Sequence, residues 1–123
     1  MTEILHKELS YGIVGATMEV HRELGPAFLE AVYQKALACE FAQRDIPYEE
    51  QKLLPVFYKQ PLVGDYKADF VIDGKIIAEI KSLSVLNATH QAQALHYLAA
   101  TGMQLAILIN FGAPTLEMKR VVR

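Results

Sequence analysis

The sequence predicts an α/β (α+β) fold in which a central mixed β-sheet is flanked by helices. Three observations lead to this prediction. Apolar residues recur every three to four positions over residues 3–44, and apolar and polar residues alternate over much of residues 48–81. A further helical stretch then separates that region from an apolar run at residues 104–110. The element order is therefore ααβββαββ, and a helix that crosses between buried strands implies helices over the sheet faces.

The composition predicts a single globular domain over residues 1–123. Hydrophobic residues make up 52% and charged residues 21%, which excludes a disordered chain. No apolar run reaches membrane-spanning length, and the N-terminus lacks a basic segment followed by an apolar one, so we expect no membrane association. The single cysteine, Cys39, cannot form an internal disulfide, and we expect it to be a packing residue of a cytoplasmic protein.

The charge balance is slightly acidic, with a net charge of −2 and an isoelectric point of about 6.1. Nucleic-acid-binding proteins usually carry a basic excess, so this balance argues against strong nonspecific binding to nucleic acid. It does not exclude a small nuclease. Carboxylates that hold a metal ion lower the isoelectric point, and the ion offsets their charge locally.

Two helices open the predicted fold. The first covers about residues 3–24 and ends at Gly25-Pro26, because proline cannot continue a helix. The second covers about residues 28–44 and ends before Pro47. Apolar stripes define the face that each helix buries: Leu9, Ile13, Ala16, Val20 and Leu24 in the first, and Leu29, Val32, Tyr33, Ala36, Leu37 and Phe41 in the second.

Glu30 falls just inside the buried arc of the second helix, between Leu37 and Phe41 at about 100° per residue. A buried carboxylate needs a partner or a metal ion, so this position favours a role in a site. The alternative is that Glu30 lies at the helix N-terminus, where the helix dipole favours a negative charge. The sequence leaves both interpretations open.

The strands centre on residues 66–81, YKADFVIDGKIIAEIK, which predict a hairpin. Residues 48–58 predict a strand before it, edged or interrupted at Pro55, and residues 59–65 a connection. Asp69 lies on the first strand of the hairpin. Glu79 and Lys81 lie on the second and must point the same way, because side chains alternate along a strand.

The loop length of this hairpin decides whether its acids can share a site. A two-residue turn at Asp73-Gly74 is a favoured connection, but it would place Asp69 and Glu79 on opposite faces. A three-residue loop of residues 72–74 would pair Asp69 with Ile77, with Glu79 as a diagonal neighbour about 7–8 Å away. A shared cation site therefore demands an odd-numbered loop. The alternative interpretation of Glu-x-Lys is a solvated strand face with a weak ion pair.

The C-terminal third predicts a helix and two strands. Residues 82–87 form a linker, Thr89 is a plausible helix cap, and the helix covers residues 89–101. Residues 104–110 predict a strand buried on both faces, and residues 116–122 an edge strand. The apolar seam of this helix is Ala92, Leu95 and Ala99, and the pair Gln93 and Tyr97 lies on another face. His90 and His96 are six residues apart and do not share a helical face, so we reject a zinc site built from them.

Taken together, the motifs resemble those of a known superfamily. The signature Asp69…Glu79-x-Lys81 resembles that of PD-(D/E)XK nucleases, and Gln93-x-x-x-Tyr97 is similar to the QxxxY motif of their RecB-type branch. Nearly the whole chain also resembles a family of small bacterial and archaeal proteins called GxxExxY proteins. The matching pieces are VHRELGP at residues 20–26, LEAVY at 29–33, YKADFVIDGKIIAEIKSL at 66–83, HQAQALHYL at 90–98 and INFG at 109–112.

Two positions depart from these patterns. Ala27 stands where the GxxExxY name has glycine, although Glu30 and Tyr33 are kept and Gly25 lies two residues earlier. Ala68 stands where the superfamily name has proline, a position that varies among its members. The acids and the lysine are intact, which argues against a degenerate site.

The resemblance implies a restriction-endonuclease-like core and divalent-metal-dependent hydrolysis of DNA or RNA. Asp69 and Glu79 would bind Mg²⁺ or Mn²⁺, which prefer hard oxygen ligands. Lys81 would position the attacking water, whose pKa the metal lowers, and would hold negative charge in the transition state. The other implied roles are metal binding by the Ile80 carbonyl and Glu30, and substrate binding or support by Gln93, Tyr97 and Tyr33.

Two other function classes stay open at this point. The first is a non-catalytic module that uses the same fold to bind nucleic acid or a partner protein. The second is a metal-dependent hydrolase of small phosphorylated substrates. A chain of 123 residues has little room for a specificity domain, which leaves specificity to a protein partner or to a homodimer.

Overall fold

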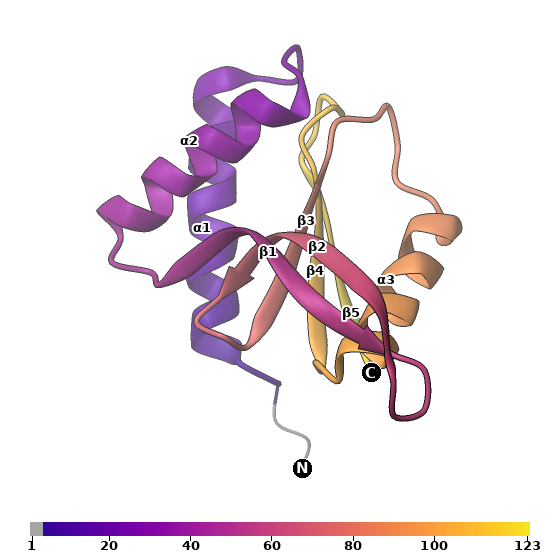
Figure 1. Ribbon diagram of the computed structural model, residues 1–123. Coiled ribbons are helices and arrows are strands. Elements are labelled where there is room, and N and C mark those ends of the chain that lie inside the picture. The colour runs from indigo at the N-terminus through magenta and orange to yellow at the C-terminus, as the bar shows by residue number, and fades with distance from the viewer. Residues whose placement is uncertain (1–3) are drawn as a thin grey trace.

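The computed structural model describes residues 4–123, which build a five-stranded sheet with helices on both faces (Figure 1). The strands lie in the order β1-β2-β3-β4-β5, with β3 and β4 parallel and the other neighbours antiparallel. This confirms the mixed sheet and the element order that the sequence predicts. The elements are α1 (Lys7–Leu24), α2 (Glu30–Gln43), β1 (Tyr48–Phe57), β2 (Leu62–Ile72), β3 (Ile76–Lys81), α3 (Ala88–Thr101), β4 (Leu105–Asn110) and β5 (Glu117–Val122).

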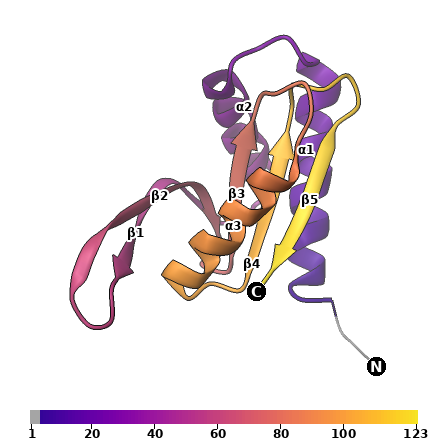
Figure 2. The same cartoon turned by 90° about the vertical axis from the view of Figure 1, so that its right-hand side faces the viewer.

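Each face of the sheet has its own apolar core. α1 and α2 cover one face, where Phe41 packs edge-on against Phe70 with ring centroids 5.3 Å apart. α3 covers the other face and lies across β3 and β4 (Figure 2), where Leu98 is fully buried beside Ile77. The run in β4 is buried on both faces, as its continuous apolar sequence predicts.

Several element ends differ from the predicted ones. α1 begins at Lys7 rather than near Glu3, which lies outside the described residues. β2 already begins at Leu62, so the connection after β1 is shorter than predicted. The cap of α3 is Asn87 and not Thr89: the Asn87 side chain accepts hydrogen bonds from the backbone N–H groups of Thr89 and His90. No helix within residues 4–123 is long and apolar enough to span a membrane.

The buried stripe of α3 is not the predicted one. Ala94 and Leu98 are buried, whereas Ala92, Leu95 and Ala99 are exposed. The helix is rich in alanine, so more than one row at helical spacing is apolar, and only packing against the sheet selects the row that is buried.

Two predictions for α2 also need correction. Leu29 is 81% exposed because it precedes the helix in an extended conformation, and Val32 is 42% exposed. Cys39, predicted to be a packing residue, is exposed as well. The buried arc keeps the predicted Tyr33, Leu37 and Phe41 and adds Ala38.

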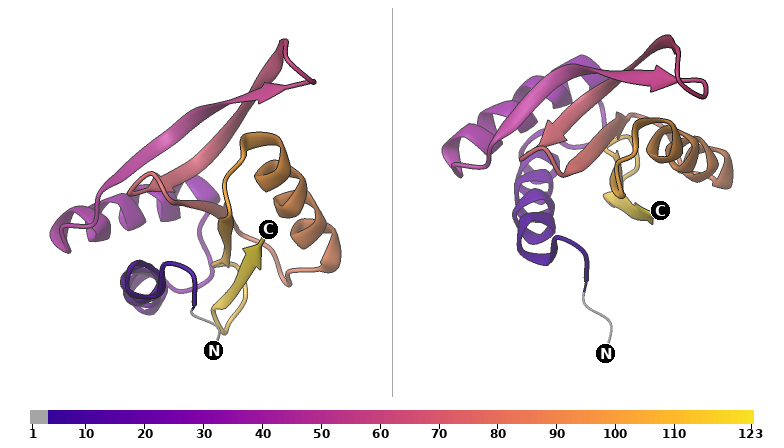
Figure 3. Two further views of the ribbon diagram at one scale, coloured as in Figure 1. Left: turned by 90° about the horizontal axis from the view of Figure 1, so that it is seen from below. Right: turned by 60° about the horizontal axis from the view of Figure 1, so that its bottom comes forward.

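β1 and β2 form a long two-stranded ribbon that passes from one face of the sheet to the other (Figure 3). Phe70 packs in the core beside α1 and α2, while Tyr66, which has the same strand parity, packs in the core beside α3. The ribbon turns over at Gln51, which has a left-handed φ of 48°. The strand pairing skips Gln51 and Asp69 at this point and resumes between Lys52 and Ala68. Strong twist is typical of two-stranded ribbons. We call residues 52–67, beyond this point, the arm.

Candidate functional site

The site forms where β2 leaves β3. The two strands pair from Ile72/Ile76 to Phe70/Ala78, and β3 then continues to Lys81 with β4 as its neighbour. The hairpin loop has three residues, which confirms the odd length that a shared site demands. It consists of residues 73–75 rather than 72–74, because Ile72 still pairs with Ile76.

The shift of the loop by one residue changes which residues face each other. Asp73 and Gly74 both adopt positive φ, at 51° and 64°, which allows the chain to turn in three residues. Extending the observed register by one step sets Asp69 opposite Glu79 and not opposite Ile77. Ile77 pairs with Val71 instead, so the predicted pairing of Asp69 with Ile77 is wrong.

Asp69 is held in place by the backbone of β3. Its Oδ2 accepts a hydrogen bond of 2.8 Å from the Ile80 N–H, which faces the edge that β2 has left. Its Oδ1 accepts a bond of 3.3 Å from the Gln51 side chain, which also donates to Gln34 on α2. The carboxylate thus replaces a missing strand-to-strand hydrogen bond, and this fixes it beside Glu79.

Glu79 lies on the face toward α3 and is 9% exposed. The hydroxyl of Tyr66 donates a hydrogen bond to its Oε1. The Tyr66 ring in turn stacks on Tyr97 of α3, with centroids 3.9 Å apart and planes 16° apart. Tyr97 therefore reaches the carboxylate through Tyr66. Sequence reasoning missed Tyr66, because simple alternation assigns it to the face opposite Asp69; the available signal was that a buried tyrosine hydroxyl needs a partner.

Burial raises the pKa of the Glu79 carboxyl to about 7, and the nearby negative charge of Asp69 adds to this rise. The Tyr66 hydroxyl, a backbone hydrogen bond from Asp69 and the Lys81 ammonium each oppose it. Burial, followed by the Glu79 charge, raises the pKa of Tyr66 far above its usual value, so its hydroxyl stays protonated and donates. Glu79 thus lies beside a second carboxyl group in surroundings that disfavour its own negative charge.

A cleft of about 570 Å³ opens over Glu79 and Lys81. The arm forms one wall and α3 the other, and the predicted residues Gln93 and Tyr97 lie on the α3 wall. The structure therefore brings together Glu79, Lys81, Gln93 and Tyr97, with Asp69 behind them on the departing strand. The complete lining is Val56, Asp65, Tyr66, Lys67, Glu79, Lys81, Gln93, His96, Tyr97 and Ala100.

Glu30 is not brought to the cleft. It is the first residue of α2, on the other side of the sheet from α3, and it is exposed, so the prediction that it lies inside a buried arc is wrong. The physical reason is that the arc is rotated toward Ala38 once Leu29 lies outside the helix. Within residues 4–123 no hydrogen bond or salt bridge joins Glu30 to Asp69, Glu79 or Lys81.

Tyr33 supports the fold next to the site. It is fully buried, its hydroxyl donates to the Gly25 carbonyl, and its ring stacks on Phe111 with centroids 4.4 Å apart. Phe111 follows β4 and its N–H donates to the Lys81 carbonyl at 3.0 Å. Tyr33 thus braces the connection between α1 and α2 against the segment that follows Lys81.

Asn110 fixes that segment directly and was also missed. It is fully buried, and its amide exchanges hydrogen bonds of 2.8 and 3.0 Å with the Leu83 backbone. Gly112 leaves room for the same contact, since a Cβ there would come within 2.4 Å of the Leu83 nitrogen. The INFG motif therefore holds the chain directly after Lys81, a role that only tertiary packing reveals.

The oxygen atoms of Asp69 and Glu79 suit a hard divalent cation. Burial is the main cause of the raised pKa of Glu79, and such an ion would offset the negative charge of Asp69 that adds to it. In the described part of the chain, no group of three or more His, Cys, Asp or Glu side chains could hold a metal ion by itself. A cation at this site would therefore complete its shell with backbone carbonyls and water, as Mg²⁺ usually does.

Comparison with known proteins extends over nearly the whole chain. Residues 7–121 match the PD-(D/E)XK nuclease superfamily. No curated protein matches. The crystal structure of SSO0001 is similar with a TM-score of 0.58 and 17% identity, over 96% of this chain but only 57% of the other, and this likeness supports the fold alone. An alkaline exonuclease from Laribacter hongkongensis, LHK-Exo, has a TM-score of 0.43 and 15% identity over 100% and 72% of the two chains, too low to support an argument.

Proposed function

Because the chain belongs to the PD-(D/E)XK nuclease superfamily, we propose that it is a divalent-metal-dependent nuclease that hydrolyses phosphodiester bonds in DNA or RNA. One observation carries the proposal. Asp69 is fixed by the Ile80 N–H beside Glu79, and Lys81 shares with Glu79 both the strand face and the cleft. Two carboxylates and an ammonium group in this arrangement are suited to phosphodiester chemistry.

Nucleases of this superfamily generally use divalent metal ions. In our proposal Asp69, Glu79 and the Ile80 carbonyl hold Mg²⁺ or Mn²⁺. The bound cation supplies a Lewis acid that lowers the pKa of water and polarises the phosphate. Glu30 takes at most an indirect part, since it is exposed at the start of α2.

Protein groups supply the remaining parts of the proposed mechanism. The Lys81 ammonium, half-buried in the cleft, holds negative charge on the phosphate and orients the attacking water. Gln93 faces the same cleft and offers an amide to the substrate or to Lys81. Tyr66 and Tyr97 keep Glu79 in one position.

Within the superfamily we propose membership of the GxxExxY family and the RecB-type branch. The LEAVY and HQAQALHYL segments support it, as does the position of Gln93 and Tyr97 on the cleft wall. A prokaryotic cytoplasm is the setting that this assignment implies.

Cleavage assays test the proposed activity. Labelled single- and double-stranded DNA and RNA are incubated with the protein in Mn²⁺, in Mg²⁺ and in chelator. We expect cleavage in the metal ions only, and we expect Lys81→Ala to lower the rate at least 100-fold while metal binding persists, since an ammonium is not a ligand.

Lys75→Ala is the matched control for this assay. Lys75 lies in the same hairpin but is exposed and paired with Asp73. If Lys81→Ala cleaves as fast as Lys75→Ala, the proposed mechanism is wrong. If wild type binds nucleic acid but cleaves none of the substrates, the non-catalytic binding module replaces the nuclease.

A further inference from the structure

Acidic residues predominate in the first part of the chain and basic residues in the second. Residues 1–50 hold nine acidic and four basic residues, and residues 51–123 hold five acidic and eight basic residues. Two of the five acids, Asp69 and Glu79, are the metal ligands proposed above. The first part builds α1, α2 and the start of β1, while the second builds the arm, α3 and the cleft. The basic excess thus belongs to the part of the chain that builds the cleft, while the cleft lining itself holds Lys67 and Lys81 against Asp65 and Glu79.

Three lysines mark this region. Lys67 and Lys81 line the cleft, and Lys59 lies at the tip of the arm. Within residues 4–123, none of the three forms a salt bridge, although Lys35, Lys52 and Lys75 each pair with an acid. Apart from Glu79, the only carboxylate in the cleft lining is Asp65. Unpaired cations around a cleft suit a polyanion.

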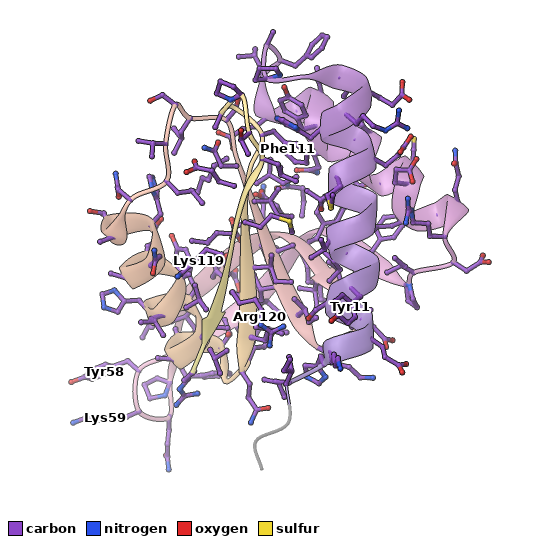
Figure 4. The ribbon with its side chains drawn as sticks, turned by 180° about the vertical axis from the view of Figure 1, so that it is seen from behind. Tyr11, Tyr58, Lys59, Phe111, Lys119 and Arg120 are labelled. Atoms are coloured by element: carbon purple, nitrogen blue, oxygen red, sulfur yellow. The ribbon has the colours of Figure 1, made fainter. Side chains whose placement is uncertain are left out.

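The tip of the arm also presents an aromatic ring. Tyr58 is 62% exposed, and the Lys59 ammonium lies 5.4 Å from its ring centroid. Figure 4 shows both side chains projecting from the tip, beside the end of α3. Tyr58 follows Val56, a residue of the cleft wall, by two positions and lies directly after the end of β1 at Phe57. An exposed ring with a neighbouring cation suits base stacking next to a backbone contact.

The shape of the cleft favours a separated strand over a duplex. Glu79 is 9% exposed in the cleft between the arm and α3, where Tyr66 of the arm stacks on Tyr97 of α3. A phosphate that reaches it must enter between two walls, which a flexible single strand can do while its bases turn outward. We propose that the cleft takes single-stranded DNA or RNA, with the backbone along Lys67 and Lys81 and a base stacked on Tyr58. The position of the scissile phosphate at Glu79 rests on the proposed nuclease function.

Binding without cleavage tests this inference. Fluorescence anisotropy in chelator measures the affinity for a labelled 12-mer of deoxythymidine, for its uridine counterpart and for a blunt 12-base-pair duplex. We expect wild type to bind a single strand at least tenfold more tightly than the duplex. Tyr58→Ala weakens single-strand binding on the order of tenfold, as loss of one stacked base does, and Tyr58→Phe keeps it.

The chain supplies a matched control on α1. Tyr11 is 65% exposed, with the Lys7 ammonium 6.0 Å from its ring centroid, and Figure 4 shows it on α1, away from the tip of the arm. Tyr11→Ala and Lys7→Gln should leave binding unchanged. Lys59→Gln and Lys67→Gln should each remove one phosphate contact. Each should therefore lower the slope of log affinity against log salt concentration by about one.

Each contrary result overturns the inference. These are no binding to either single strand, a duplex bound as tightly as a single strand, or equal effects of Tyr58→Ala and Tyr11→Ala. An arm variant that changes the sedimentation of the free protein instead assigns the arm to self-association, which also overturns it. Because no cleavage is needed, single-strand binding without metal-dependent cleavage keeps this inference and rejects only the nuclease.

Discussion

The two faces of β3 differ in what they bury. The face toward α1 and α2 carries the even-numbered residues from Ile76 to Ile80, which are at most 1% exposed and enclosed by apolar side chains. The face toward α3 carries Ile77 and then Glu79 and Lys81, which open into the cleft. One face of this six-residue strand thus serves stability and the other serves the site. Substitutions on the core face should lower the stability of the fold, whereas replacing Glu79 on the other face should raise it.

The largest effect is expected on the core face. Ile76→Ala should lower the free energy of unfolding by about 2–5 kcal/mol, because Ile76 is fully buried and its loss leaves a cavity. Urea denaturation measures this loss. The stabilisation by added Mn²⁺ should be the same in the variant and in wild type. A changed response to metal would show that the two faces are not separate.

The next effect has the opposite sign and depends on pH. In metal-free solution the pKa of Glu79 is about 7 in the fold, against 4.5 for the ordinary value, so the folded state keeps a proton that the unfolded state has lost. Its contribution to stability is complete below pH 4.5 and falls as pH rises to 7, by about 3 kcal/mol in total.

Glu79→Gln removes this titration while its amide oxygen still accepts a hydrogen bond from Tyr66. The variant should therefore gain stability relative to wild type as pH rises from 4.5 to 7. Denaturation at several pH values, each in chelator, measures the difference. A difference that stays constant over this range contradicts a buried, charge-disfavoured carboxyl.

Local pattern was enough to predict most of the fold. The apolar run of β4 correctly predicts a strand buried on both faces, and the lysine and arginine of β5 correctly predict an edge strand. The need for Asp69 and Glu79 to share a site also predicted an odd hairpin loop, which the structure has at residues 73–75. Alternation and helical spacing are local properties, so a sequence contains them completely.

The surroundings of Glu79 could not be predicted in the same way. Tyr66 reaches Glu79 because the ribbon turns over at Gln51, and that turn depends on packing against two helix layers. Asn110 acts on Leu83 across 27 residues. Contacts of this kind have no periodic signal, so a single sequence does not reveal them.

Metal binding provides the third test of the difference between the two faces of β3. A cation at ten times its Kd would stabilise the fold by about 1.4 kcal/mol, which raises the Tm by roughly 5 °C in a chain of this size. We expect millimolar Mn²⁺ or Mg²⁺ to cause such a rise and Asp69→Asn to abolish it. Asp73→Asn is the matched control, since Asp73 is an exposed acid at the turn of the same hairpin. Equal rises in wild type and Asp69→Asn would place the ion elsewhere.

The smallest effect concerns the two stacked tyrosines. Tyr66→Phe keeps the ring on Tyr97 but removes the hydroxyl that donates to Glu79. One such bond is worth about 1 kcal/mol, so metal affinity should fall about fivefold. Because the chain has no tryptophan, tyrosine fluorescence can follow the titration. Tyr97→Phe should have no effect, since it keeps the stack.

Tyr97→Leu distinguishes an indirect role of Tyr97 from a direct one. If Tyr97 acts only by holding the Tyr66 ring, Tyr97→Leu should weaken metal binding about as much as Tyr66→Phe, and the double variant should be no weaker than either. Additive losses would mean that Tyr97 acts on the site independently of Tyr66. The α3 face would then position Glu79 by two separate routes, whereas the stack of rings at 3.9 Å predicts a single one.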